Sequence, residues 1–260
     1  MQCVNLRRAR LWRIPDQTAG SLPTILFVHG AWLGAWTFEN FLGYFAERGV
    51  GCAAIDLRGH GGLVQDDVFL TSGQREMAED VVEACQAIGG EVVVAGHSAG
   101  AAVAAIAASR FPTVGLVLLA PSPPGQLPGL EPQAPVPDGR PFAPGSIEHV
   151  KRKFVPNFSH EDVVDFAERL VHESPALLND RRLLRVEIDR SRISGPALCL
   201  SAEKELGDFH KPGQDLATAR FYDAEYWFLT GAGHCFSLEP HWRDAAFVIE
   251  RWYGSHFLIP

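Results

Sequence analysis

A single serine stands between two glycines in the segment Gly96-His97-Ser98-Ala99-Gly100. The pattern Gly-x-Ser-x-Gly is typical of a sharp strand-to-helix turn that exposes the serine hydroxyl in a strained backbone conformation. The residues two positions before and after the serine must be tiny, because strand and helix nearly touch there. The partial positive charge of the helix N-terminus also faces such a site. We interpret Ser98 as a nucleophile; a purely structural turn is the alternative.

A serine hydroxyl is a weak nucleophile unless a base removes its proton. Among the ten histidines, His234 is the best candidate for this base. It follows a strand-like run near the end of the chain and lies in the glycine-rich turn Gly231-Ala232-Gly233-His234. A histidine base would make activity rise with pH through about 6–7.

The imidazole base in turn needs a carboxylate that fixes its tautomer and stabilises its protonated form. Three carboxylates compete in the segment Glu203-Lys204-Glu205-Leu206-Gly207-Asp208, which also follows a strand-like run. Spacing alone leaves Glu203, Glu205 and Asp208 open.

Acyl transfer also needs N–H donors for the oxyanion of the tetrahedral intermediate. We expect one from the backbone of Ala99. The second is expected from Ala31, in the loop His29-Gly30-Ala31-Trp32. Because main-chain groups do this work, the side chains at both positions need only be small.

The elements that must position these residues are strand-like runs alternating with helical stretches. Such alternation predicts an α/β fold with a mostly parallel sheet, in which ligands bind beyond the carboxyl ends of the strands. The candidate residues all lie at such ends. The β-rich runs are residues 24–28, 51–55, 91–95, 114–120, 197–202 and 225–230, and helical spacing is found at 77–88 and 242–252.

One segment interrupts this rhythm. Residues 121–144 hold nine of the 18 prolines, which is incompatible with helix or central strand. Helical stretches are expected afterwards, near 146–154, 159–171 and 175–186, with Ser159 and Asp162 typical of a helix start. We therefore expect a core of residues 1–120 and 194–260 with a helical lid, 121–193; a disordered linker is the alternative. The substrate pocket is expected to be lined by Trp32, Trp36, Phe154 and Phe158.

Composition excludes several classes of function. The net charge of −8 argues against a nucleic-acid partner. The uncharged stretch 92–109 is just long enough to raise the question of a membrane span, but its alanines, its two glycines, His97 and Ser98 favour strand, turn and helix. An odd number of cysteines, five, and an N-terminus interrupted by arginines indicate a cytoplasmic protein without a secretory signal. The oligomeric state stays open.

No cofactor or metal is expected. His29, His60, His97 and His234 lack metal-ligand spacing. The glycines near residues 59–62 lack the pattern of a nucleotide-binding turn.

At this point the chain resembles the α/β-hydrolase superfamily, within its group of capped esterases and hydrolases. The resemblance spans nearly the full length and is carried by HGAWLGAW from His29, DLRGHG from Asp56, GHSAG around Ser98 and GAGH ending at His234. HGAW is also similar to plant methyl esterases and hydroxynitrile lyases. The resemblance implies a triad of Ser98, an acid and His234, with oxyanion donors at Ala31 and Ala99.

The resemblance also ranks the three acids. The family's acid commonly lies nine residues after the proline that opens its strand, and counting from Pro196 gives Glu205 where aspartate is usual. Glu205 is therefore preferred, followed by Asp208 and Glu203. His29, Asp56, Arg58 and His60 are expected to shape loops.

The sequence therefore predicts a serine hydrolase that cleaves a small-to-medium, partly apolar ester through an acyl-enzyme, with only a small-molecule substrate as partner. A thioesterase, a lactonase, or a carbon–carbon hydrolase or lyase could use the same triad. A non-catalytic ligand-binding homologue is the other alternative. An epoxide hydrolase or dehalogenase would need aspartate in place of Ser98.

Overall fold

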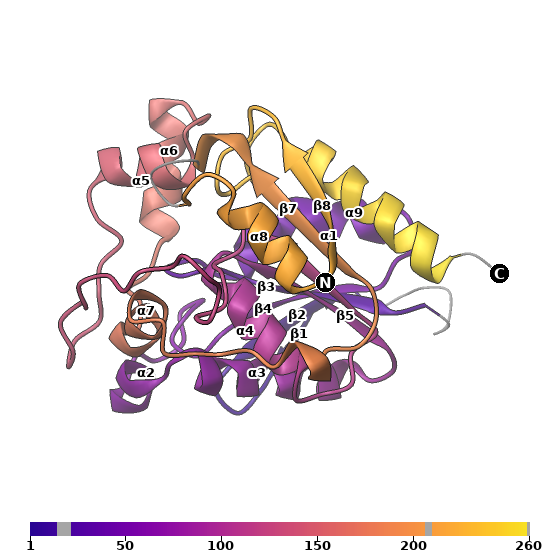
Figure 1. Ribbon diagram of the computed structural model, residues 1–260, viewed down its shortest axis with the longest axis horizontal. Helices are drawn as coiled ribbons and strands as arrows, with labels where there is room; N and C mark the ends of the chain where they lie inside the picture. Colours follow the sequence, from indigo (N-terminus) through magenta and orange to yellow (C-terminus); the bar gives the residue numbers. More distant parts are fainter. Residues whose placement is uncertain (15–21, 206–209, 259–260) are drawn as a thin grey trace.

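An eight-stranded sheet runs through the middle of the protein, in a computed structural model that describes residues 1–14, 22–205 and 210–258 (Figure 1). Its strand order is β1-β2-β4-β3-β5-β6-β7-β8. β2 pairs antiparallel with β1 and β4, and all other pairs are parallel. The strands are β1 (Gln2–Asn5), β2 (Arg10–Ile14), β3 (Thr24–Val28), β4 (Cys52–Asp56), β5 (Val92–His97), β6 (Gly115–Leu119), β7 (Ala197–Ala202) and β8 (Ala224–Leu229).

The six predicted strand runs are confirmed to within two residues at each end. β4, β5, β6 and β7 are buried at every position, as expected of parallel strands covered on both faces. β1 and β2 were not predicted, because their short, partly polar sequences do not carry the signal of a buried strand. They form the antiparallel edge of the sheet.

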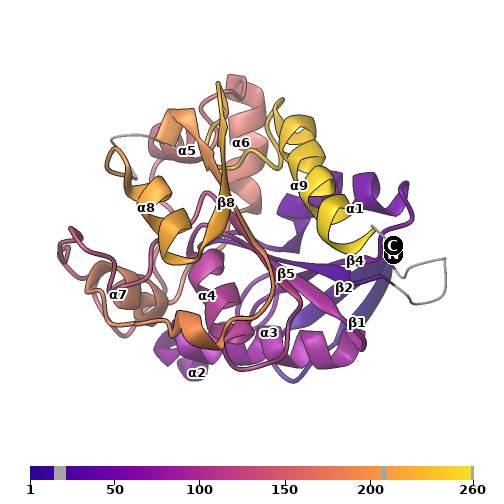
Figure 2. The same cartoon turned by 45° about the vertical axis from the view of Figure 1, so that its right-hand side comes forward.

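Helices cover both faces of the sheet, as Figure 2 shows. α1 (Glu39–Ala46) and α9 (Trp242–Phe257) pack on one face, against Phe27, Val93 and Leu200 among others. The opposite face is covered by α3 (Gln74–Ile88), α4 (Ala99–Ala108) and α8 (Gln214–Phe221), and α2 (Asp67–Thr71) lies beside α7 (Pro175–Arg182). The α/β-hydrolase fold is thus present. None of the helices in the described part of the chain has the length and apolar content needed to cross a membrane.

The segment between β6 and β7 contains three helices where the sequence predicts them. They are α5 (Ile147–Phe154), α6 (His160–Arg169) and α7 (Pro175–Arg182). Ser159 caps α6 through Asp162, in the predicted pairing. Val150, Phe154 and Phe166 from α5 and α6 form a small core with Leu33 and Cys235 from loops at the sheet edge. This segment is therefore packed onto the sheet's loops.

The loop after β4 is held by a buried ion pair, consistent with its expected loop-shaping role. The Arg58 guanidinium donates to Asp80 Oδ1 at 2.7 Å and Oδ2 at 2.9 Å, and the Arg58 backbone N–H donates to Asp80 Oδ2 at 3.0 Å. The two side chains are only 4% and 2% exposed. Asp80 thus ties this loop to α3.

We expect Asp80→Ala to lower the free energy of unfolding by about 3–5 kcal/mol, because it leaves a buried guanidinium without its partner. Glu79→Ala is the matched control: its carboxylate lies 3.6 Å from the same guanidinium but is 54% exposed, so its loss should cost less than about 1 kcal/mol. Urea unfolding of the two variants checks this. Equal losses would show that burial of the pair is unimportant.

Candidate active site

Ser98 lies at the join of β5 and α4 with φ 54° and ψ −123°, a backbone region that non-glycine residues rarely adopt. Its glycine neighbours make this join possible. A Cβ at Gly96 would lie 2.3 Å from the Gly100 carbonyl oxygen, and one at Gly100 would lie 2.2 Å from the His29 carbonyl oxygen. The prediction that both positions must be tiny is confirmed.

The loop after β3 passes directly over Ser98. A Cβ at Gly30 would lie 2.9 Å from the Ser98 Cβ, so the next residue, Ala31, is adjacent to the hydroxyl-bearing turn. Ala31 and Ala99 are 7% and 4% exposed. Within residues 1–14, 22–205 and 210–258, neither backbone N–H donates to another protein group. Both amides are thus available beside Ser98.

Glu205 is the carboxylate that contacts His234. Its Oε2 lies 2.7 Å from His234 Nδ1, and its Oε1 accepts from the Ala202 N–H at 2.9 Å. Glu205 and His234 are each 1% exposed. Glu203 instead accepts from the Gly231 N–H. Asp208 lies outside the described residues.

His97 connects the serine turn to the histidine loop. Its Nε2–H donates to the His234 carbonyl oxygen at 2.9 Å, and the two rings contact each other at a tilt of 52° with centroids 4.8 Å apart. Burial, together with the nearby His234, lowers the pKa of His97 to about 3. This neutral imidazole therefore bridges the segments that carry Ser98 and His234.

His234 itself is also held neutral. Burial lowers its pKa well below the ordinary value, and the positive charges of His210 and Arg181 lower it further. The pH range of 6–7 expected from the sequence for this base stays a prediction, and the direction of this shift is toward a lower pH. A neutral imidazole whose Nδ1–H faces Glu205 leaves the lone pair on Nε2, as a general base requires.

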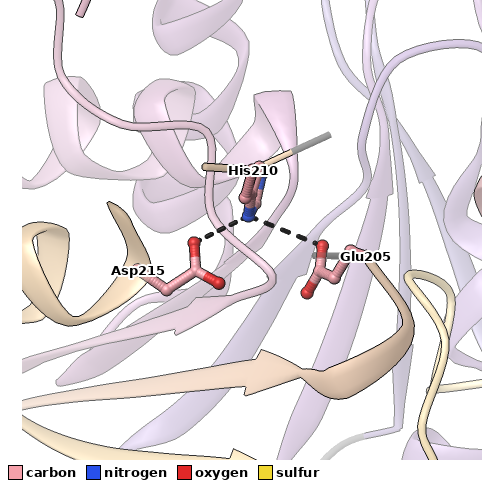
Figure 3. Close-up of side chains that lie close together, drawn as sticks. All are labelled: Glu205, His210 and Asp215. Atoms are coloured by element: carbon pink, nitrogen blue, oxygen red, sulfur yellow. Dashed lines mark ion pairs between the residues drawn. The ribbon is translucent and has the colours of Figure 1, made fainter. Parts of the chain in front are cut away.

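Two residues that the sequence did not single out complete the surroundings of Glu205 (Figure 3). His210 Nδ1 lies 2.6 Å from Asp215 Oδ1 and 3.6 Å from Glu205 Oε2, and all three side chains are buried. Burial alone would lower the pKa of His210, but the two carboxylates outweigh it and raise the pKa. The His210 cation in turn opposes the rise that burial imposes on the pKa of Glu205.

The types of these three side chains also suit a metal ion, because their candidate ligand atoms lie within 4.8 Å of one another. The distances favour an ion pair instead. Neighbouring ligands of a tetrahedral zinc are about 3.3 Å apart, whereas His210 Nδ1 and Asp215 Oδ1 are 2.6 Å apart. We therefore interpret the cluster as a histidine cation between two carboxylates.

A glutamate from the segment between β6 and β7 shapes the loop over Ser98. Glu173 is 1% exposed, and its Oε2 accepts from the Trp32 N–H at 3.0 Å and lies 3.1 Å from His60 Nε2. Trp32 there has a φ of 65°. The sequence carries no signal for Glu173, because the contact joins positions 141 residues apart.

The same segment also holds the histidine loop. The Phe154 carbonyl accepts from the Cys235 N–H at 2.8 Å. Glu239 accepts from the Gly233 N–H at 2.7 Å and from the Asn157 N–H at 2.9 Å. Residues on both sides of His234 are therefore fastened to the turn that follows α5.

A cavity of about 720 Å³ opens beside these loops, with Trp32 and Phe154 in its wall. Their rings make an edge contact at 5.8 Å, and Phe154 also contacts the His234 ring at 6.0 Å. Trp36 and Phe158 do not line this cavity. Both rings pack against Phe166, at 5.5 and 6.1 Å, because α6 occupies the space between them.

A family model described as "Alpha/beta hydrolase family" matches residues 25–247. No curated protein sequence matches the chain. Among solved structures, a thermophilic esterase from Thermogutta terrifontis is 18% identical with a TM-score of 0.68, covering 97% of this chain and 98% of the other.

Two further structures show how varied the similar proteins are. A methylesterase from Arabidopsis is 18% identical with a TM-score of 0.69 and covers 89% of this chain and 99% of its own. The thioesterase domain from the curacin biosynthetic pathway is 18% identical with a TM-score of 0.64, covering 97% of both chains. At these identities the likeness extends to the fold alone.

The neutral burial of His97 has a consequence for stability. In the unfolded chain this histidine takes up a proton below about pH 6.5, whereas in the folded protein it does so only near pH 3. The stability advantage of the wild type over His97→Gln should therefore shrink by about 1.4 kcal/mol per pH unit as the pH falls below 6.5. Urea unfolding at pH 7.0, 6.0 and 5.5 measures this difference. A difference independent of pH would contradict neutral burial.

Proposed function

The chain belongs to the alpha/beta hydrolase family, and on that premise we propose that it is a serine hydrolase that cleaves a carboxylic ester through an acyl-enzyme. The observation that carries this proposal is the 2.7 Å contact between Glu205 and His234, in a loop fastened through His97 to the strained turn of Ser98. Nucleophile, acid and base, Ser98, Glu205 and His234, follow one another along the chain in the order expected of this family.

In the proposed reaction His234 Nε2 removes the proton of Ser98 as its Oγ attacks the ester carbonyl carbon. The resulting oxyanion accepts hydrogen bonds from the N–H groups of Ala31 and Ala99, and Glu205 stabilises the imidazolium. His234 then gives its proton to the departing alkoxide as the C–O bond breaks. A water molecule, activated by the same imidazole, hydrolyses the acyl-enzyme and restores the Ser98 hydroxyl.

The lowered pKa of His234 supports the first step. Burial and the charges of His210 and Arg181 keep the imidazole neutral in the resting protein. Protonation becomes favourable only when negative charge develops on the oxyanion. The buried Glu205, close to the His210 cation, then supplies the compensating charge.

We further propose that residues 121–193 act as a lid over this site. Glu173 fixes the Trp32 loop, while Phe154 and Asn157 hold the loop of His234. The apolar rings of Trp32 and Phe154 suit a partly apolar acyl or alcohol group. Thioester or lactone cleavage would use the same acyl-enzyme step.

We expect a fluorophosphonate probe to phosphonylate Ser98, with loss of fluoride and with the mass added to the peptide that contains residue 98. Ser98→Ala should abolish labelling. Ser122→Ala is the matched control and should leave it unchanged, because this neighbouring serine donates its backbone N–H to the Ser98 carbonyl oxygen, a hydrogen bond that alanine keeps. Mass spectrometry of the folded proteins decides the matter: an unlabelled Ser98 would contradict the proposal and favour a non-catalytic homologue.

Glu205→Gln should lower kcat for para-nitrophenyl butyrate by about 10²- to 10⁴-fold, because the amide no longer stabilises the imidazolium or selects its tautomer. Asp208→Asn should change kcat little. Steady-state kinetics of both variants, with circular dichroism to verify folding, test the assignment. A large loss in Asp208→Asn together with a small one in Glu205→Gln would move the acid to Asp208.

A further inference from the structure

Cationic side chains gather in the wall of the 720 Å³ cavity beside the site. The chain as a whole carries a net charge of −8, so a cavity lined by basic residues has the opposite charge to the protein overall. Among the described residues that line this cavity, none is an aspartate or a glutamate. The basic residues in its wall are Arg140, His149, Lys153, Arg181 and Arg182.

These cations come from three separate parts of the chain. Arg140 lies in the proline-rich stretch, Lys153 in the last turn of α5, and Arg181 and Arg182 in the last turn of α7. A helix C-terminus favours positive charge within its own last turn. That effect does not explain why the ends of two helices and a loop direct their cations at one cavity, where they repel one another.

Arg181 has no charge partner in the part of the chain that the structure describes. No carboxylate there lies within 4 Å of the guanidinium of Arg181 or Arg182. Arg182 instead donates from Nε to the Ala134 carbonyl at 2.5 Å. Burial and the charge of Arg182 lower the pKa of Arg181. Because Arg181 is partly buried and its guanidinium has no charge partner among the described residues, this position is suited to an anion.

The cavity is coupled to the proposed base. Phe154 in its wall contacts the His234 ring, and the positive charges of Arg181 and Lys153 both contribute to lowering the pKa of His234. An anion bound to Arg181 would therefore lie in the same cavity as Phe154, whose ring contacts that of the proposed base.

Building on the proposed function, we propose that the substrate carries an anionic group, a carboxylate or a phosphate, which Arg181 binds in this cavity while Trp32 and Phe154 contact its apolar part. A guanidinium recognises either anion through paired hydrogen bonds. The cavity volume of about 720 Å³ fits a small organic substrate. The two sources of the anion are a carboxylate in the acyl chain and the phosphates of a coenzyme A thioester.

Two matched substrate pairs separate these sources. The first is the mono-para-nitrophenyl ester of glutaric acid against its neutral methyl ester. The second is butyryl-coenzyme A against the neutral thioester of butyrate with N-acetylcysteamine. At pH 8 we expect wild-type kcat/KM to favour the anionic member of one pair by about tenfold or more.

Arg181→Gln should remove most of that preference through KM, so that kcat/KM falls far more for the anionic member than for the neutral one. Arg220→Gln, an exposed arginine on α8, is the matched control and should keep the preference. Equal kcat/KM within both pairs, or an equal loss for both members in Arg181→Gln, would overturn the proposal.

A binding measurement keeps this inference separate from the catalytic one. Calorimetry with Ser98→Ala tests glutarate and coenzyme A as ligands without turnover, and we expect one of them to bind and to lose at least about tenfold in affinity when Arg181→Gln is added. If Ser98→Ala binds a ligand but the fluorophosphonate does not label the wild type, the anion site is supported and the proposed hydrolysis is contradicted. If Ser98→Ala binds neither ligand but the wild type is labelled, the proposed hydrolysis is supported and the anion site is contradicted.

Discussion

The close contact between β5 and α4 at Ser98 is the constraint on which the rest of the site depends. A Cβ at Gly96 would lie 2.3 Å from facing backbone and one at Gly100 would lie 2.2 Å from it, so the helix can begin directly at the end of the strand only because both residues are glycine. The N-terminus of α4 and the loop of Gly30 therefore converge on one residue. Because the parallel strands end at the same edge, the loops after β3, β7 and β8 can all reach it.

Charge within the site is decided by competition between burial and local partners. Burial keeps His29, His97 and His234 neutral, with lowered pKa values. His60 and His210 are equally buried, yet their pKa values are raised because a carboxylate lies against each ring. The neutral imidazole of His234 thus lies beside the buried Glu205 and near the His210 cation, and in the proposed reaction this arrangement favours charge separation only as the oxyanion develops.

The segment between β6 and β7 does more than cover the site, because its residues hold two of the loops that form it. Glu173 from this segment holds the loop of Trp32, and Phe154 with Asn157 holds the loop of His234. Its helices α5 and α7 also bring Lys153 and Arg181 to the cavity. The position of the loops and the charge of the cavity therefore both depend on how this one insert packs.

The sequence by itself determined the parallel strands, the three inserted helices and the glycine-flanked turn at Ser98, because hydrophobic period, turn chemistry and the steric need for glycine are local properties. It could order the candidate acids only by resemblance. The tertiary structure decided which carboxylate faces His234. It also decided that His210 and Asp215 lie behind that carboxylate, and that Glu173 binds the loop of Trp32. These contacts join side chains whose direction depends on packing between distant segments, and no local pattern encodes that direction.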